Sequence, residues 1–297
     1  MIIIPGPASR ALGEGIAGEL GVDAHPAEHR AFPDGESYIR LTAPVEGEIA
    51  VIVQTTSPPQ DTRLMQLFMM TATAAGLDAE RVICVVPYLA YARQDKRFLG
   101  GEALSLDIVI HLLEAAGADD LIVIDAHNAG SLRRAQRQHS IGVENLTAVP
   151  LLAEHLRELG LGGAYSLAPD GGAVHLAEAA GEVLGGGSGF FEKRRNRMTG
   201  EIEMTVRELD VRGRDAAVFD DIISSGGTMA RAVAGLRAQG ARRVAAACTH
   251  ALFRGDAERR ILEAGADLIV ATDTVATKFS QVSVARLIAE RLRAMTR

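Results

Sequence analysis

The chain has 297 residues, of which 47% are hydrophobic and 23% charged, and its formal net charge is −7. This composition is that of an ordinary globular protein and excludes a disordered or fibrous one. An acidic chain lacks the long-range attraction that binds nucleic acids or anionic membranes, so we expect no nucleic acid and no membrane as partner. No apolar run reaches the roughly 18 residues of a membrane span and no signal-peptide pattern is seen, so we expect a cytoplasmic protein.

Apolar strand-like runs alternate with amphipathic helical stretches along the chain. In the first half we predict strands at residues 1–4, 50–53, 81–86 and 121–124, and helices at 8–20, 61–75 and 105–115. In the second half we predict strands at 165–167, 189–192, 216–219, 244–248 and 268–271, and helices at 173–184, 228–239, 256–264 and 283–293. This alternation predicts an α/β fold in which mainly parallel sheets are flanked by helices.

The two series of elements predict two domains, residues 1–142 and 143–297. A new helix with Pro150 in its first turn begins just after the boundary. The last helix is free to pack on either domain. Cys84 and Cys248 each lie in an apolar strand-like run and are expected to be buried free thiols.

Three segments interrupt the α/β pattern. Residues 29–41 contain the turn sequence Pro33-Asp34-Gly35 between two polar-apolar strands, which predicts an antiparallel hairpin. Residues 87–103 form a long connection between a strand and a helix, and long connections are often lids or binding loops. Residues 185–200 form a second long loop. Both loops are rich in basic residues.

The predicted strand at residues 216–219 is followed by two carboxylates and a turn of small residues that opens a helix. Ligands of parallel α/β sheets collect where strands end, so Asp220 and Asp221 are candidates for binding sugar hydroxyls or a metal. The turn offers hydroxyl groups, backbone N–H groups and a helix N-terminus to a phosphate: Ser224, Ser225, Gly226, Gly227 and Thr228. The combination predicts a sugar-phosphate site.

The second basic loop contains Lys193, one of only three lysines, and Arg195. An ammonium and a guanidinium group two residues apart in an extended segment suit a transferring phosphoryl group. The alternative is a solvated run of charge on a surface hairpin.

Several other polar residues are open to two interpretations. His127 follows a strand and either binds a metal or Mg–nucleotide or is a lone surface histidine. Asp170 either caps the next helix or holds a cation. His111 and His155 lie in helical patterns and are interpreted as structural.

Taken together, the motifs FPDGE, PYLAYARQDKRF, DAHN, APDGG, EKRR, DDIISSGGT and KFSQVSV occur in the order typical of one family. The chain resembles the ribose-phosphate diphosphokinase (PRPP synthetase) family over almost its whole length. The resemblance implies two phosphoribosyltransferase-like domains, the first with a hairpin insertion. It also implies transfer of the β,γ-diphosphoryl group of Mg–ATP to the C1 hydroxyl of ribose 5-phosphate, giving PRPP and AMP.

The resemblance also implies a role for each matching residue. Phe32, Asp34 and Glu36 of a neighbouring subunit would hold the adenine of ATP. Arg93, Gln94 and His127 would bind ATP, His127 by contacting its Mg²⁺, and Asp170 would bind a metal beside the ribose. Lys193 and Arg195 would be catalytic, Arg195 also binding ribose 5-phosphate together with Asp220, Asp221 and residues 224–228. The expected partners are ATP, ribose 5-phosphate and a second copy of the chain, with a dimer as the minimal unit.

One departure concerns Ser224, where many family members have an aspartate. Two alternatives to the synthetase are a phosphoribosyltransferase that consumes PRPP and a non-catalytic regulatory member of the family. The hairpin and Lys193 count against the first, and the retained Lys193, Arg195 and His127 count against the second.

Overall fold

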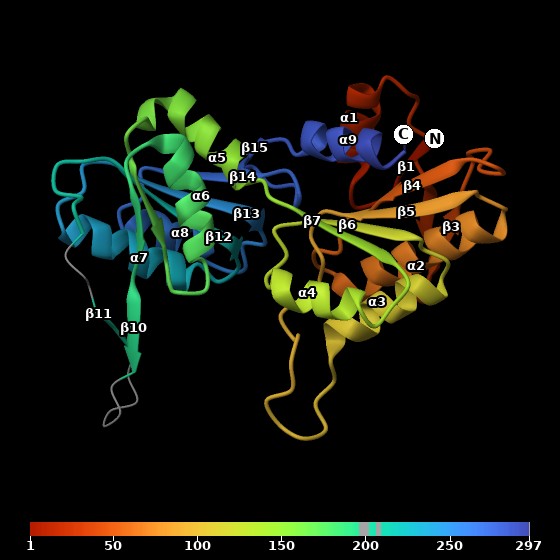
Figure 1. The fold of residues 1–297 in the computed structure, drawn as a ribbon, viewed down its shortest axis with the longest axis horizontal. Coiled ribbons are helices and arrows are strands. Elements are labelled where there is room, and N and C mark those ends of the chain that lie inside the picture. Colours follow the sequence, from red (N-terminus) through yellow and green to blue (C-terminus); the bar gives the residue numbers. More distant parts are fainter. Residues whose placement is uncertain (196–201, 206–208, 297) are drawn as a thin grey trace. The chain divides into compact units, whose positions relative to one another are not determined.

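The computed structural model describes residues 1–195, 202–205 and 209–296, with the backbone alone for residues 192–195 and 202–205. The chain divides into two compact units, Met1–Thr147 with Ser283–Arg297, and Ala148–Val282 (Figure 1). The second unit is therefore inserted ahead of the last helix of the first. The predicted boundary between residues 142 and 143 falls at the first residue of β7 (Gly142–Leu146), which pairs with β6 of the first unit.

The first unit contains a five-stranded sheet in the order β1-β4-β5-β6-β7, and all neighbouring strands are parallel. The strands are β1 (Ile2–Pro5), β4 (Ile49–Val53), β5 (Arg81–Val86), β6 (Asp120–Ile124) and β7. The helices are α1 (Arg10–Leu20), α2 (Gln60–Gly76), α3 (Ser105–Ala115), α4 (Ala129–Gln136) and α9 (Ala285–Met295). Val51 and Ile52 point to opposite faces of the sheet and both are fully buried, as expected where helices cover both faces.

The second unit contains a six-stranded sheet in the order β15-β14-β13-β12-β8-β9, again with parallel neighbours. The strands are β8 (Tyr165–Ala168), β9 (Ser188–Phe190), β12 (Ala216–Ile223), β13 (Val244–Ala251), β14 (Leu268–Thr272) and β15 (Ser280–Val282). The helical segments are α5 (Val149–Leu156), the π-helical turn η1 (Arg157–Leu161), α6 (Val174–Leu184), α7 (Gly227–Ala238) and α8 (Ala257–Glu263). The predicted α/β class is thus confirmed.

An antiparallel hairpin extends from each unit. In the first unit, β2 (Glu28–Ala31) pairs with β3 (Ser37–Arg40), as the turn chemistry predicts. In the second, β10 (Glu192–Arg195) pairs with β11 (Ile202–Thr205) and projects away from the six-stranded sheet (Figure 1). Residues 192–195 lie in a segment interpreted from the sequence as a loop.

The two cysteines are buried and free, which confirms that prediction. Burial raises the pKa of the Cys84 thiol to about 12, and it also raises that of Cys248. Among the described residues, no helix has the length and apolar character needed to cross a membrane.

The last helix belongs to the first unit. Ile288 and Leu292 of α9 are fully buried, and the Arg81 guanidinium donates to the carbonyl oxygen of Met295 at 3.1 Å. Arg291 forms an ion pair with Glu144 of β7. The position of this helix, which the sequence leaves open, is therefore fixed by contacts with β5 and β7.

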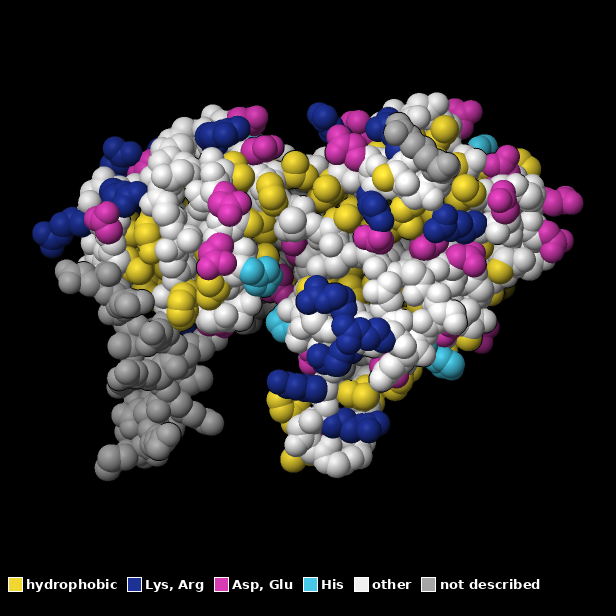
Figure 2. All heavy atoms as spheres, viewed as in Figure 1, with side chains coloured by type: hydrophobic (Ala, Val, Ile, Leu, Met, Phe, Trp, Pro, Cys, Tyr) yellow, Lys and Arg dark blue, Asp and Glu magenta, His cyan; other side chains and the backbone are white. Residues whose placement is uncertain are grey.

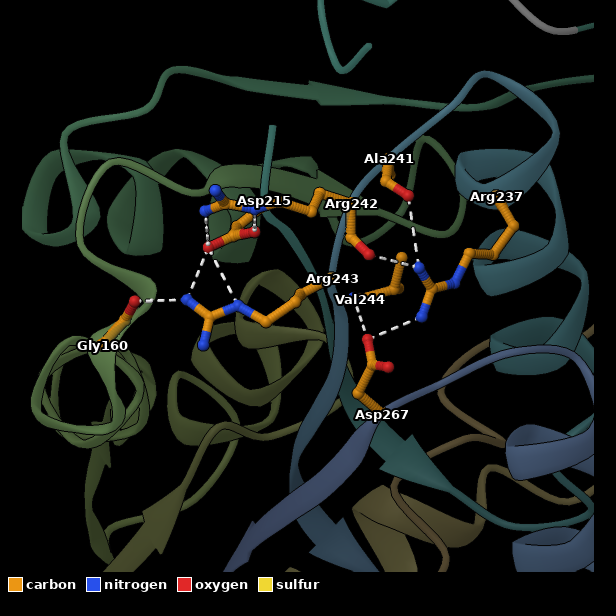
Figure 3. Close-up of polar contacts among 8 residues, drawn as sticks. All are labelled: Gly160, Asp215, Arg237, Ala241, Arg242, Arg243, Val244 and Asp267. Atoms are coloured by element: carbon orange, nitrogen blue, oxygen red, sulfur yellow. Dashed lines mark hydrogen bonds and ion pairs between the residues drawn. The ribbon is translucent and has the colours of Figure 1, made fainter. Parts of the chain in front are cut away.

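A buried carboxylate fixes the beginning of β12. The side chain of Asp215 is 6% exposed and accepts hydrogen bonds from Arg242 Nε and Nη2, both at 2.8 Å, and from Arg243 Nε at 3.1 Å (Figure 3). Arg243 also donates to the carbonyl oxygen of Gly160 in η1. The hydrogen bonds from Arg242, and then those from Arg243, hold the pKa of Asp215 well below its ordinary value. These bonds join the start of β12 to the start of β13 and to Gly160 near the end of η1.

Candidate functional site

The central element of the second unit carries the two candidate carboxylates. β12 pairs with β8 only over residues 216–218 but continues beside β13 as far as Ile223. Asp220 and Asp221 therefore lie within the strand rather than after it, on the stretch that extends beyond the pairing with β8. Each accepts a hydrogen bond from the next N–H group: Asp221 N–H to Asp220 at 3.0 Å, and Ile222 N–H to Asp221 at 2.9 Å.

Asp220 is held in an environment that opposes its negative charge. Burial raises the pKa of this carboxyl group well above its ordinary value, and the neighbouring charges of Asp221 and Asp170 raise it further. Asp170 belongs to the turn after β8, the strand beside β12. A divalent cation near these carboxylates would relieve their repulsion, and hard oxygen ligands are the kind that Mg²⁺ prefers. The residues present therefore fit a magnesium ion.

Asp170 is not the N-cap of α6, a position that Ala173 occupies. Its Oδ1 instead accepts a hydrogen bond from the Gly172 N–H at 2.9 Å and closes the turn before the helix. The capping interpretation is therefore wrong in detail, while its role as a cation ligand stays a prediction.

The turn after β12 leads directly into α7. Gly226 has a φ of +73° and is the N-cap of this helix, which has no side-chain cap hydrogen bond. A Cβ at Gly226 would lie 2.8 Å from the carbonyl oxygen of Ala257, so a larger residue does not fit there. The turn is held from the other side by the Arg254 N–H, which donates to the carbonyl oxygen of Ser224 at 2.9 Å. The result is a rigid helix N-terminus of the kind that binds anions.

Two arginines near this turn were not singled out from the sequence. A Cβ built at Gly227 would lie 3.6 Å from Nη1 of Arg260, on α8, and 4.0 Å from Nη1 of Arg231, on α7. Their guanidinium groups add positive charge at the mouth of the turn. Arg231 could have been predicted from the sequence, since it lies one turn into the helix that the motif opens. Arg260 could not, because only the packing of α8 brings it near the turn.

The predicted catalytic residues lie in the second hairpin. The backbone of Lys193 and Arg195 forms part of β10, opposite Met204 and Ile202 of β11. Their side chains lie outside the described part of the structure. Their roles stay predictions.

In the first unit, the hairpin tip presents the residues predicted to hold adenine. Phe32 is 41% exposed, and Asp34 and Glu36 are exposed as well. The Glu36 N–H donates to Asp34 Oδ1 at 3.2 Å, and the ring of Tyr38 meets that of Phe32 edge to face with centroids 6.3 Å apart. A hollow of about 470 Å³ lies between this end of the hairpin and α2. An aromatic face beside hydrogen-bond acceptors suits a purine base.

The long loop after β5 is fastened to the segment that contains His127. Asp95 accepts hydrogen bonds from Asn128 Nδ2 at 2.6 Å and from Ser131 Oγ at 2.7 Å. Asn128 is also the N-cap of α4 and accepts a hydrogen bond from the Ser131 N–H. Arg93 and Gln94, immediately before Asp95, are thereby held near the exposed His127. Sequence reasoning missed Asp95, although its position beside Gln94 was a usable signal.

The backbone before His127 has an unusual conformation. Asp125, at the end of β6, has a φ of +38°, a region that non-glycine residues seldom occupy. Its N–H donates to the carbonyl oxygen of Leu146 in β7 at 2.8 Å, and the next N–H, of Ala126, donates to Asn145 Oδ1 at 2.9 Å. These bonds keep a sharp turn that presents His127 at the carboxyl end of the sheet.

Basic side chains gather over α4 and the long loop of the first unit (Figure 2). They include Arg133 and Arg134 in the last turn of α4, with Lys96 and Arg97 in the loop. In a chain of net charge −7, such a local concentration of positive charge is suited to an anionic ligand with several phosphate groups.

Two parallel α/β units, one with carboxylates followed by an anion-binding turn at a helix N-terminus, define a protein with two phosphoribosyltransferase-like domains. Comparison with known families agrees. Residues 1–117 match the N-terminal domain of ribose phosphate pyrophosphokinase, and residues 151–281 match the phosphoribosyl transferase domain.

Full-length relatives are similar along almost the whole chain. The ribose-phosphate pyrophosphokinase of Methanothermobacter thermautotrophicus is 42% identical over 97% of this chain and 99% of its own. That of Methanopyrus kandleri is 39% identical over 98% of each chain. The crystal structure of phosphoribosylpyrophosphate synthetase from Mycobacterium smegmatis is 30% identical, covers 99% of this chain and 98% of its own, and superposes with a TM-score of 0.86. The chain belongs to the ribose-phosphate pyrophosphokinase family of enzymes.

Proposed function

We propose that this chain transfers the β,γ-diphosphoryl group of ATP to the C1 hydroxyl of ribose 5-phosphate, giving PRPP and AMP. The observation that carries the proposal is the run of Asp220 and Asp221 on β12 into the anion-binding turn at the start of α7. Carboxylates accept hydrogen bonds from ribose hydroxyls, and a helix N-terminus binds phosphate. A molecule of ribose 5-phosphate carries both the hydroxyl groups and the phosphate. Membership of the family supports the same reaction.

In this reaction the C1 oxygen forms a bond to the β-phosphorus of ATP as the bond between that phosphorus and the oxygen of the α-phosphate breaks. AMP leaves with that oxygen, and the hydroxyl proton passes to solvent or to a phosphate oxygen. Such a transfer needs alignment and charge neutralisation more than covalent catalysis.

Each half of the reaction is assigned to residues of one unit. We assign the ribose acceptor to Asp220, Asp221 and residues 224–228, with Arg231 and Arg260 adding positive charge near the 5-phosphate. ATP is assigned to the loop residues Arg93 and Gln94 and to His127, which Asp95 holds near one another. Lys193 and Arg195 are assigned to the transferring diphosphoryl group, as the motif implies.

Magnesium is the cofactor that this arrangement fits. When bound, Mg²⁺ would neutralise charge on the phosphate oxygens and on the carboxylates near the ribose. We assign His127 to the magnesium ion of Mg–ATP and Asp170 to a magnesium ion beside the ribose, and the raised pKa of Asp220 supports a cation near Asp170.

The exposed hairpin tip supports a shared site in a homo-oligomer. Phe32 is 41% exposed, although a purine-binding ring is expected to be covered when the site is complete. We assign Phe32, Asp34 and Glu36 to the adenine of ATP bound mainly by a second copy of the chain. A dimer is then the smallest active unit, and light scattering of the purified chain measures it.

The test of the function is a product assay. Purified protein with Mg²⁺, ATP and ribose 5-phosphate is expected to form AMP and PRPP in equal amounts. A phosphoribosyltransferase would instead release pyrophosphate from PRPP when given a nucleobase, and a regulatory protein would form none of these products. Either of those results would contradict the proposal.

A further inference from the structure

A cluster of histidine and carboxylate side chains lies apart from the proposed catalytic residues. His111 and Glu114 are three residues apart on α3 and therefore share one face of the helix. His139, in the connection from α4 to β7, lies against them. One ligand atom from each of the three lies within 4.8 Å of the others, and in the described part of the chain this is the one group of three such residues that close together.

The ring of His139 is held between two carboxylates. Its side chain is 9% exposed, with Nδ1 at 3.0 Å from Glu114 Oε2 and Nε2 at 3.1 Å from Asp107 Oδ1. If Nε2–H donates to Asp107, the lone pair of Nδ1 faces the Glu114 carboxylate, and two acceptors meet at 3.0 Å. A cation between them removes that conflict. Metal-binding histidines typically donate their second ring N–H to a carboxylate in this way.

Glu114 is fixed from its other side. The Ser140 N–H donates to Glu114 Oε1 at 2.6 Å, which leaves Oε2 directed at His139. The rings of His111 and His139 have centroids 5.7 Å apart and an interplanar angle of 40°. Two imidazoles and a carboxylate thus converge from α3 and the connection after α4.

We propose that His111, Glu114 and His139 bind a zinc ion, with Asp107 orienting His139. Two nitrogen ligands and one oxygen ligand suit Zn²⁺, whereas Mg²⁺ prefers an all-oxygen set. His111 is exposed, so water has access to a fourth position. The ion ties α3, which follows the long loop, to the connection between α4 and β7. His111, which was interpreted from the sequence as structural, is then a zinc ligand.

Zinc binding to the full-length protein tests the proposal. The zinc-free chain, in excess Mg²⁺ and without nucleotide, is titrated with Zn²⁺ in a calorimeter. We expect one equivalent to bind to the wild type, and His111→Ala to weaken that binding at least about 100-fold. Asp107→Asn should weaken it by about 10- to 100-fold, the usual effect of removing a carboxylate that orients a ligand.

Thermal unfolding gives a second readout. At a free zinc concentration of about 100 times the dissociation constant, binding shifts the unfolding equilibrium about 100-fold toward the folded state. Zinc should therefore raise the melting temperature of the wild type and not that of His111→Ala. His111 is exposed, so this variant is expected to fold in the absence of metal.

The second unit offers a matched control. His155 and Glu158 repeat the spacing of three residues, with Nδ1 3.9 Å from Oε2, but no second histidine belongs to that pair among the described residues. His155→Ala should bind zinc as the wild type does. Failure of the wild type to bind an equivalent of zinc overturns the proposal, and His139 would then only bridge Asp107 and Glu114. Equally tight binding by His111→Ala also overturns it.

Discussion

The negative charge of Asp220 suits the proposed binding of ribose but destabilises the fold. Burial and the charges of Asp221 and Asp170 raise the pKa of its carboxyl group above the ordinary 3.8. The folded chain therefore holds this proton more tightly than the unfolded chain, so the group destabilises the fold increasingly as the pH rises above 3.8. Each unit by which a pKa is raised corresponds to about 1.4 kcal/mol at a pH above both values.

Asp220→Asn should accordingly raise the free energy of unfolding at neutral pH and lower the activity. An asparagine Oδ1 still accepts the Asp221 N–H, so the local backbone is retained. Urea unfolding at about pH 8 and about pH 4 measures the effect, which should shrink at the lower pH as both states become protonated. Asp23→Asn, at an exposed position, is the control and should change neither quantity. A lower free energy of unfolding for Asp220→Asn would show that repulsion from Asp221 and Asp170 does not destabilise the wild type.

Lys193 is the residue on which the proposed chemistry depends most. An ammonium group that meets charge developing in the transition state lowers the barrier without tightening ground-state binding. Lys193→Ala should therefore reduce kcat by about 100-fold or more, with the affinity for ATP largely retained. Steady-state kinetics and equilibrium ATP binding measure the two effects separately.

The matched control for this change is Lys278→Ala. Lys278 is an exposed lysine of the second unit and forms an ion pair with Glu258 at 2.7 Å. Its removal should leave kcat unchanged, because a surface ion pair contributes little. An unchanged kcat in Lys193→Ala would remove that residue from the proposed reaction.

At the scale of elements, β12 is held at both ends by different chemistry. Its last residues enter the turn 224–228, while its beginning is fixed by Asp215 and the two arginines at the start of β13 (Figure 3). Strand position and ligand position are thus linked, since a shift of β12 would move Asp220 and Asp221 relative to α7.

Asp215→Asn should weaken this end of the sheet. The substitution removes charge-assisted hydrogen bonds from a nearly buried group, so the free energy of unfolding at neutral pH should fall by about 1 to 3 kcal/mol. Because folding lowers the pKa of Asp215 below 3.8, its stabilising effect is present above that pH and is lost as the pH falls. The difference between variant and wild type should therefore diminish below about pH 4 in unfolding experiments.

Asp210→Asn is the comparison for this experiment. Asp210 also pairs with an arginine, Arg214, at 2.9 Å, but its side chain is 90% exposed. The exposed pair should contribute less than about 1 kcal/mol, with little dependence on pH. Equal effects of the two substitutions would mean that the burial of Asp215 has no consequence for stability.

At the scale of the whole molecule, the sequence predicted the helices and strands better than the tertiary contacts between them. β5 (Arg81–Val86) is buried on both faces, has a continuous apolar run and was predicted with its observed bounds, whereas β12 and β13 extend beyond the predicted residues 216–219 and 244–248. The edge strand β7 escaped prediction because it contains Glu144 and Asn145 and is partly exposed. The sugar-phosphate motif was visible because its residues are consecutive. Arg260 and the pair of His111 with His139 were not, since only tertiary packing brings their side chains together.

The last helix, α9, stabilises strands and a helix that lie far from it in the sequence. α9 follows the complete second unit, yet it packs on α1 and is bonded to Arg81 in β5. Removing residues 283–297 should therefore destabilise the first unit. Loss of the fully buried Ile288 and Leu292 alone corresponds to about 3 to 6 kcal/mol, at about 1.5 to 3 kcal/mol for each side chain.

Hydrogen exchange locates this effect along the chain. In the protein truncated after Val282, amide protection should fall in β1, α1 and β5, while β12, β13 and β14 keep theirs. Removal of residues 296 and 297 alone is the control and should alter neither group, because Met295 and its bond to Arg81 remain. Loss of protection confined to the second unit would show that α9 stabilises the unit that precedes it in sequence, contrary to its packing on α1.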